Sequence, residues 1–115
     1  MARREAKQYK ALYFDLIVQL LKQHYPKKNH LGAYKDIKRY LLQHGFTHEQ
    51  WSGYHSRAKM TDLEIFDLVQ DMAQQMTWFS KCVNHFEVTN IGTNYNLIEI
   101  LETEDSGTDL DPPAL

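Results

Sequence analysis

The pattern of hydrophobic and polar positions opens with a nearly continuous apolar run that contains one charge. The run covers residues 11–18 and includes Asp15, and residues 10–15 predict a buried first strand. Apolar residues then recur at intervals of three and four until Pro26, which is the spacing of one helical face. A short helix is therefore expected directly after the first strand.

The middle of the chain predicts a second helix followed by a hairpin. The helical pattern covers residues 32–44, and Gly45 suits the position just past a helix end. Residues 46–57 are rich in aromatic side chains around Gly53, which is typical of two short strands joined by a turn.

The strongest helical signal lies in the second half of the chain. Thr61 and Glu64 form a capping-box pattern, which predicts that a helix begins there and extends over residues 62–80. Residues 82–90 alternate as a strand, and residues 94–101 predict a short additional strand.

This element order predicts an α+β fold, a ferredoxin-like β-α-β-β-α-β sandwich with an additional C-terminal strand. We expect residues 1–101 to form one domain with a short basic N-terminal extension. Four antiparallel strands would carry both helices on one face. A second copy of the chain is the simplest cover for the other face, so a homodimer is expected.

Composition bears on the size of the fold and on its cellular location. The chain has 115 residues, enough for one domain with a real core. Its single cysteine, Cys82, favours the reducing cytoplasm. No apolar stretch is long enough to span a membrane, and the charged first residues argue against a secretory signal. Residues 102–115 contain five acids and no base, so we predict a disordered acidic tail.

Basic residues are concentrated near the start of the chain. Residues 1–40 contain ten Lys or Arg and three acids. Without the acidic tail the remaining chain is mildly basic, which permits contact with a polyanion without requiring it.

Several residue strings resemble the virulence-associated protein D (VapD) family. They occur in the family's order over about residues 11–101, with near-family spacing. The strings are Tyr13-Phe14-Asp15-Leu16, His24-Tyr25-Pro26-Lys27, Ala33-Tyr34-Lys35-Asp36-Ile37, Leu42-Gln43-His44-Gly45-Phe46, Gln50-Trp51-Ser52-Gly53-Tyr54, and Trp78-Phe79 with Val83. Members are small ferredoxin-like homodimers of the bacterial cytoplasm, implicated as endoribonucleases and similar in fold to the small CRISPR-associated nucleases. Asn84-His85 replaces the Arg-Asp that the family usually has.

Asp15 is the first candidate for chemistry, because an unpaired carboxylate inside a core is costly. It could cap a helix that starts at Leu16 or Ile17, or it could pair with a Lys or Arg. The resemblance favours a third role, in which two copies of Asp15 at a dimer axis hold a divalent cation, Mg²⁺, or position a water molecule.

Ser52, His55 and His85 complete the catalytic candidates. Ser52 is expected to donate a hydrogen bond to a phosphate or to satisfy a turn, because a lone serine is a poor nucleophile. A histidine titrates near neutrality and can act as general acid or base. In a ferredoxin-like sheet His55 and His85 could each approach Asp15.

The candidate RNA-binding residues are Lys35, Lys38, Arg39 and Tyr54. The three cations could line up along phosphates, although the solvated face of an amphipathic helix is the simpler explanation. Tyr54 could stack on a base or pack in the core.

Two functional hypotheses follow. The first is an endoribonuclease of the VapD type, acting either through a metal-activated water or through the RNA 2′-hydroxyl. For an endoribonuclease, the resemblance implies a toxin or virulence role and an antitoxin protein as partner. The second is a dimeric RNA- or protein-binding module of the same fold without catalysis.

Overall fold

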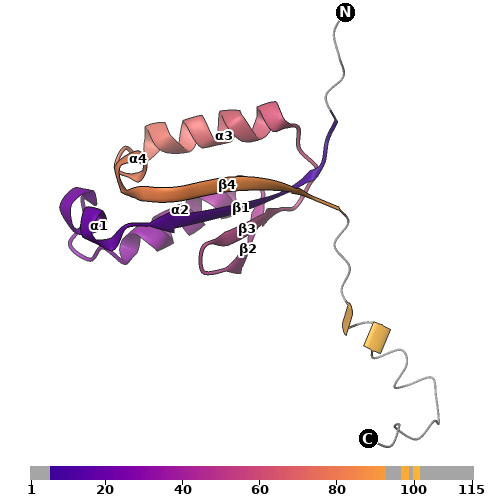
Figure 1. Cartoon of the computed structure of the whole chain (residues 1–115), viewed down its shortest axis with the longest axis horizontal. Helices are drawn as coiled ribbons and strands as arrows, with labels where there is room; N and C mark the ends of the chain where they lie inside the picture. Colours follow the sequence, from indigo (N-terminus) through magenta and orange to yellow (C-terminus); the bar gives the residue numbers. More distant parts are fainter. Residues whose placement is uncertain (1–5, 93–96, 99, 102–115) are drawn as a thin grey trace, which may run out of the picture.

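The computed structural model describes residues 6–92, 97, 98, 100 and 101, and within them the elements follow the expected order (Figure 1). They are β1 (Tyr9–Leu16), α1 (Val18–His24), α2 (Gly32–Gln43), β2 (Phe46–Gln50), β3 (Gly53–Ser56), α3 (Asp62–Gln75), α4 (Phe79–Cys82) and β4 (Val83–Ile91).

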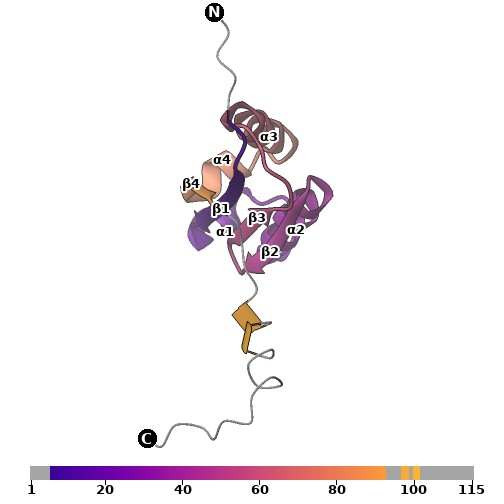
Figure 2. The ribbon, with the colours of Figure 1, turned by 90° about the vertical axis from the view of Figure 1, so that its right-hand side faces the viewer.

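The four strands form one antiparallel sheet in the order β2-β3-β1-β4. This is the strand order of a ferredoxin-like fold, so the predicted fold class is confirmed. The first strand, β1, lies in the centre of the sheet between β3 and β4. Figure 2 shows α2 and α3 on the same side of the sheet. Tyr40 of α2 joins the two helices, because its hydroxyl donates to the backbone oxygen of Leu68 in α3 at 3.2 Å.

The two faces of β1 differ, although most of its residues are apolar or aromatic. Lys10, Leu12, Phe14 and Leu16 are buried on the helix side, whereas Tyr13 and Asp15 are exposed on the other face. Successive side chains in a strand point to opposite faces, so this result follows from the strand geometry. The prediction that Asp15 lies in a buried run was wrong for this reason.

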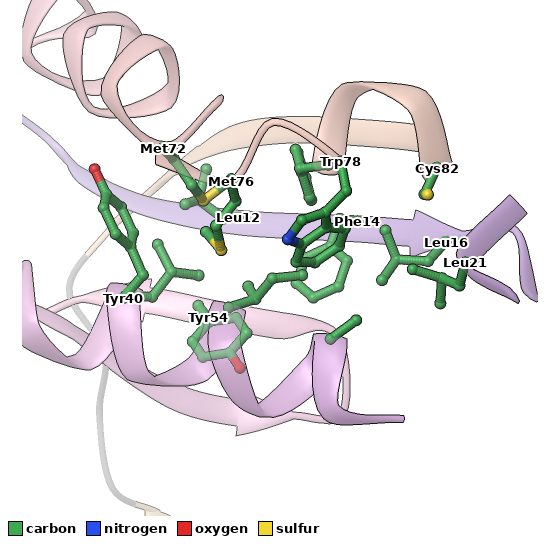
Figure 3. Close-up of a cluster of buried hydrophobic side chains, with 14 of the residues drawn as sticks. Leu12, Phe14, Leu16, Leu21, Tyr40, Tyr54, Met72, Met76, Trp78 and Cys82 are labelled. Carbon is green, nitrogen blue, oxygen red and sulfur yellow. The ribbon is translucent and has the colours of Figure 1, made fainter. Parts of the chain in front are cut away.

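Aromatic rings pack with aliphatic and methionine side chains in the core between the sheet and the helices (Figure 3). Phe14 lies at its centre, with ring centroids of four neighbours 6.1–6.4 Å away. These neighbours are Tyr34, Tyr54, Phe79 and Phe86. Offset and edge-on contacts of this kind stabilise a core beyond the apolar area that they bury.

The predicted signals for helix ends are confirmed at two places. The Thr61 side chain accepts from the Glu64 backbone N–H at 3.1 Å, and the Glu64 carboxylate accepts from the Thr61 backbone N–H at 2.9 Å. Gly45 follows the end of α2 with a φ of 90°, a left-handed conformation that glycine adopts without strain.

Two predictions about helices were wrong. The helix expected over residues 62–80 ends at Gln75, and the separate short helix α4 follows. Asp15 does not cap the following helix, because α1 begins at Val18 and its N-cap residue is Ile17.

The predicted additional strand over residues 94–101 is not confirmed. The residues of that segment that the structure describes are 97, 98, 100 and 101, and their backbone is helical. Residues 94–96, 99 and the predicted acidic tail at 102–115 lie outside the described residues. Within the described part of the chain, no helix has the length and apolar character needed to cross a bilayer.

The sheet face opposite the helices is largely polar. Register and alternation assign to it Tyr13, Asp15, His55, His85 and Glu87. Because an antiparallel sheet tolerates a solvated polar face, the sheet alone does not require a second subunit there. The homodimer stays a prediction.

Candidate functional site

Asp15 lies directly opposite His85 in the antiparallel pairing of β1 with β4. Paired residues share one face of a sheet, with Cβ atoms about 4.5–5.5 Å apart. Nε2 of His85 is 3.0 Å from Oε2 of Glu87, an ion pair when the imidazole is protonated. The Tyr13 ring lies 6.1 Å from the His85 ring. The exposed face therefore gathers a carboxylate, an imidazole oriented by a second carboxylate, and an aromatic ring.

The Asp15 carboxylate is exposed, and no hydrogen bond or ion pair engages it within the described residues. It is therefore accessible to a ligand. Across those residues no three His, Cys, Asp or Glu side chains come together as a metal-binding group. Mg²⁺ often takes only one or two carboxylates and fills its remaining positions with water and phosphate oxygens. Asp15 fits that mode only if other ligands come from RNA, water or another subunit.

The remaining catalytic candidates lie at different distances from Asp15. His55 pairs with Ala11, four residues before Asp15, or about 13 Å along the strand. The fold thus brings His85 to Asp15 and leaves His55 further along the same face. Ser52 is closer, because its backbone oxygen accepts from the Phe14 N–H at 3.2 Å.

A basic and aromatic cleft of about 540 Å³ lies between α2, the segment before it and the β2–β3 hairpin. Its lining residues are Lys27, Asn29, Leu31, Gly32, Tyr34, Lys35, Lys38, His48, Trp51 and Tyr54. They include three lysines and no acid. We refer to this set as the basic aromatic cleft.

Three of the four predicted RNA-binding residues line the basic aromatic cleft. Lys35 and Lys38 are exposed on it. Tyr54 is only 1% exposed, and its ring stacks on His48 at 4.7 Å, so it forms an inner wall. Burial raises the pKa of the Tyr54 hydroxyl to about 12, which keeps it neutral. Arg39 is outside the lining, with Nη1 3.7 Å from Oδ1 of Asp36.

Trp51, in the lining of the basic aromatic cleft, stands in the hairpin turn beside the strand that carries Asp15. The β1–β3 register pairs Tyr13 with Gly53, so the strand residue Asp15 lies level with the turn that contains Trp51. Burial raises the pKa of the Tyr34 hydroxyl, a hydrogen bond with the Trp51 side chain lowers it, and the charge of Asp15 raises it. The electrostatic effect of Asp15 therefore reaches the aromatic end of the cleft.

The sequence patterns did not identify Glu87 or Tyr34 as site residues. Glu87 had a usable signal, because it stands two positions after His85 in a predicted strand and so shares its face. Tyr34 had none, since only the packing of α2 against the hairpin brings it into the cleft.

Two curated proteins are similar to this chain over most of its length. One is Endoribonuclease VapD 2 of Riemerella anatipestifer, which is 27% identical over 88 residues, covering 76% of this chain and 94% of that protein. The other is the Endoribonuclease VapD homolog of Helicobacter pylori, 28% identical over 92 residues, covering 80% and 95%. No family model matches the chain. The two similarities support the resemblance drawn from the residue strings.

Proposed function

We propose that this chain, as a relative of VapD endoribonucleases, cleaves RNA phosphodiester bonds at the exposed face of its sheet. One observation carries the proposal: Asp15 faces His85 across the β1–β4 pairing, and Glu87 holds the His85 imidazole at 3.0 Å. A histidine fixed by a carboxylate is a common general base, because the carboxylate orients the ring and stabilises its protonated form.

The proposed reaction uses the RNA itself as nucleophile. Neutral His85 accepts the proton of a 2′-hydroxyl, and the 2′-oxygen bonds to the adjacent phosphorus. The bond from phosphorus to the 5′-oxygen breaks, and water protonates the leaving oxygen. The products are a 2′,3′-cyclic phosphate and a 5′-hydroxyl. Asp15 supports this step by attracting the positive charge that develops on the imidazole opposite it during the reaction.

A metal-dependent route remains part of the proposal because Asp15 is exposed and accessible. Mg²⁺ bound there would neutralise phosphate charge and activate a water molecule. Chemical mapping of the product ends separates the two routes. Cyclic phosphate ends that form in excess chelator support the 2′-hydroxyl route, whereas 3′-hydroxyl and 5′-phosphate ends that vanish with chelator support the metal route.

The central test compares His85→Gln, Asp15→Asn and a matched control, His24→Gln, on α1. General acid–base catalysis typically contributes 10²–10⁴-fold, so we expect His85→Gln to lower kcat by about 100-fold or more. Asp15→Asn should lower kcat as well, and His24→Gln should leave it unchanged. Retained circular dichroism spectra would show that the variants fold. Equal rates for all four proteins would refute the proposed site.

Absence of RNase activity in the purified wild-type protein would favour the binding module instead. In that case the same sheet face and the basic aromatic cleft would bind RNA or protein without cutting it. Wild-type protein that binds RNA but does not cleave it would support this alternative.

We further propose that the chain forms a homodimer through α3 and the edge strand β4. Phe66 and Val88 are 56% and 40% exposed there, and they border an apolar groove of about 310 Å³. Exposed apolar surface of this kind is typical of an interface. Light scattering should give twice the subunit mass, and Phe66→Glu should give the single mass. A wild-type monomer at working concentration would contradict the dimer.

The cytoplasmic location stays a prediction from the single cysteine and the family resemblance, and the toxin or virulence role and an antitoxin protein stay predictions from the resemblance. Co-purification of a specific protein that abolishes RNA cleavage would support the antitoxin.

A further inference from the structure

We infer that the basic aromatic cleft binds one unpaired nucleotide of a single-stranded RNA, with the base stacked on Trp51 and the flanking phosphates beside Lys35 and Lys38. The inference rests on the proposed function in one respect, that RNA is the substrate. It adds the class of RNA and the residues that select it.

Trp51 offers the stacking surface. It is 63% exposed in the turn between β2 and β3. The Tyr34 ring supports it at a centroid distance of 4.8 Å and an interplanar angle of 37°. A ring that is held on one side and open on the other is suited to receive a base.

Lys35 and Lys38 supply the charge. Both are exposed, and neither forms an ion pair within the described residues. They stand three positions apart on α2, so they lie on the same side of the helix. Lys27 also lines the cleft, but its Nζ is 3.1 Å from Oδ1 of Asp36 and is already neutralised. Lys35 and Lys38 can therefore each contact one phosphate of a bound RNA strand.

The volume and shape favour an unpaired nucleotide. A cavity of about 540 Å³ lies within the range of sites that enclose small molecules. Bases inside an RNA duplex are stacked on their neighbours and cannot place a face on a protein ring. A single strand can place one base against Trp51 and continue toward β1, where Phe14 beside Asp15 donates its N–H to the backbone oxygen of Ser52.

The test measures binding without cleavage. A fluorescein-labelled 2′-O-methyl RNA of about 10 nucleotides, which lacks the attacking hydroxyl, is titrated with the full chain and followed by anisotropy. Stacking contributes enough per base that Trp51→Ala should weaken binding by about 10-fold. Trp51→Phe keeps a ring and should recover most of the affinity. The same RNA annealed to its complement should bind less tightly.

The charge arm uses Lys35→Gln with Lys38→Gln and a matched double control. The control is Lys22→Gln with Lys81→Gln, which removes two exposed lysines outside the cleft. Each lost phosphate contact lowers the slope of log affinity against log salt by about 0.7, so the cleft variant should lose about 1.4. The control should keep more of the wild-type slope and affinity.

Three outcomes would overturn the inference. Trp51→Ala could bind the single strand as tightly as wild type, the duplex could bind equally well, or an acidic peptide could compete with RNA irrespective of Trp51. The last result would identify a surface for acidic protein. None of these outcomes depends on catalysis. A His85→Gln variant that loses RNA cleavage but keeps RNA binding would show that the chemistry and the cleft can be tested separately. In a cleaving protein, Trp51→Ala should raise KM more than it lowers kcat.

Discussion

Lys10 of β1 and Asp62 of α3 form an ion pair that joins the central strand to the start of the longest helix. The Lys10 side chain is 1% exposed and also donates to Oδ1 of Asn90, whereas Asp62 is 56% exposed. A buried cation that loses its partner is strongly destabilising, because the remaining charge stays out of water.

We therefore expect Asp62→Ala to lower the free energy of unfolding by about 2 kcal/mol, below the usual cost for a fully buried pair because Asp62 is half exposed. Lys10→Met should cost little, since it keeps most of the side-chain volume. In the Lys10→Met background, Asp62→Ala should lose most of its effect. Urea unfolding of the four proteins measures this, and equal costs in both backgrounds would contradict the pair.

The capping box at Thr61 makes a second prediction. Thr61→Ala removes the acceptor for the Glu64 backbone N–H, which typically costs about 1 kcal/mol of stability. Thr61→Ser keeps the hydroxyl and serves as the matched control. Urea unfolding of the two variants should separate them. If alanine and serine give the same midpoint, the cap does not stabilise α3.

Alkaline pH should unfold the protein through its buried tyrosines. Burial is the main cause that raises the pKa of Tyr25, Tyr34, Tyr40 and Tyr54, and hydrogen bonds to Asp36 and Asp71 add to it for Tyr25 and Tyr40. Because the folded pKa lies above the ordinary 10.0, their stabilising contribution is complete below pH 10 and is lost as the pH rises toward about 12.

An absorbance titration of the phenolates, with circular dichroism alongside, measures this effect. We expect some tyrosines to ionise only as the fold is lost. Tyr54→Phe removes one of these groups and should reduce the pH dependence above 10. Ionisation of every tyrosine near pH 10 in a folded protein would contradict the prediction.

Cys82 should be inert in the native protein. It is fully buried at the end of α4, and burial raises the pKa of its thiol. A thiol reagent reacts with the thiolate and needs access to it. We expect slow labelling at neutral pH and labelling in urea that follows unfolding. Rapid reaction in native buffer would mean that α4 opens readily.

Local patterns in the sequence predicted the fold well but the site only in part. The Thr61 capping box, Gly45 and the spacing of apolar residues determined where helices begin or end, because these signals act within a few neighbouring residues. The helix predicted over residues 62–80 ends at Gln75 in the structure. The apolar pattern continues from α3 into α4, so it gave no signal for the break between them.

The parts of the site that the sequence did not predict depend on contacts between segments far apart in the chain. Both His55 and His85 were expected near Asp15, and only the register of β1 with β4 selects His85. Lys35, Lys38 and Arg39 of α2 looked like one cationic group, but Arg39 pairs with Asp36 while the two lysines line the cleft.

The sequence by itself determined the order of the elements, the two faces of its helices and the presence of a carboxylate in the first strand. Only the tertiary structure decided that Asp15 faces outward, that His85 stands opposite it and that Trp51 packs on Tyr34 in the lining of a cleft. The physical reason is that helix and strand periodicity depends on neighbouring residues. The relations that form a site depend instead on strand register and on packing between segments far apart in the chain.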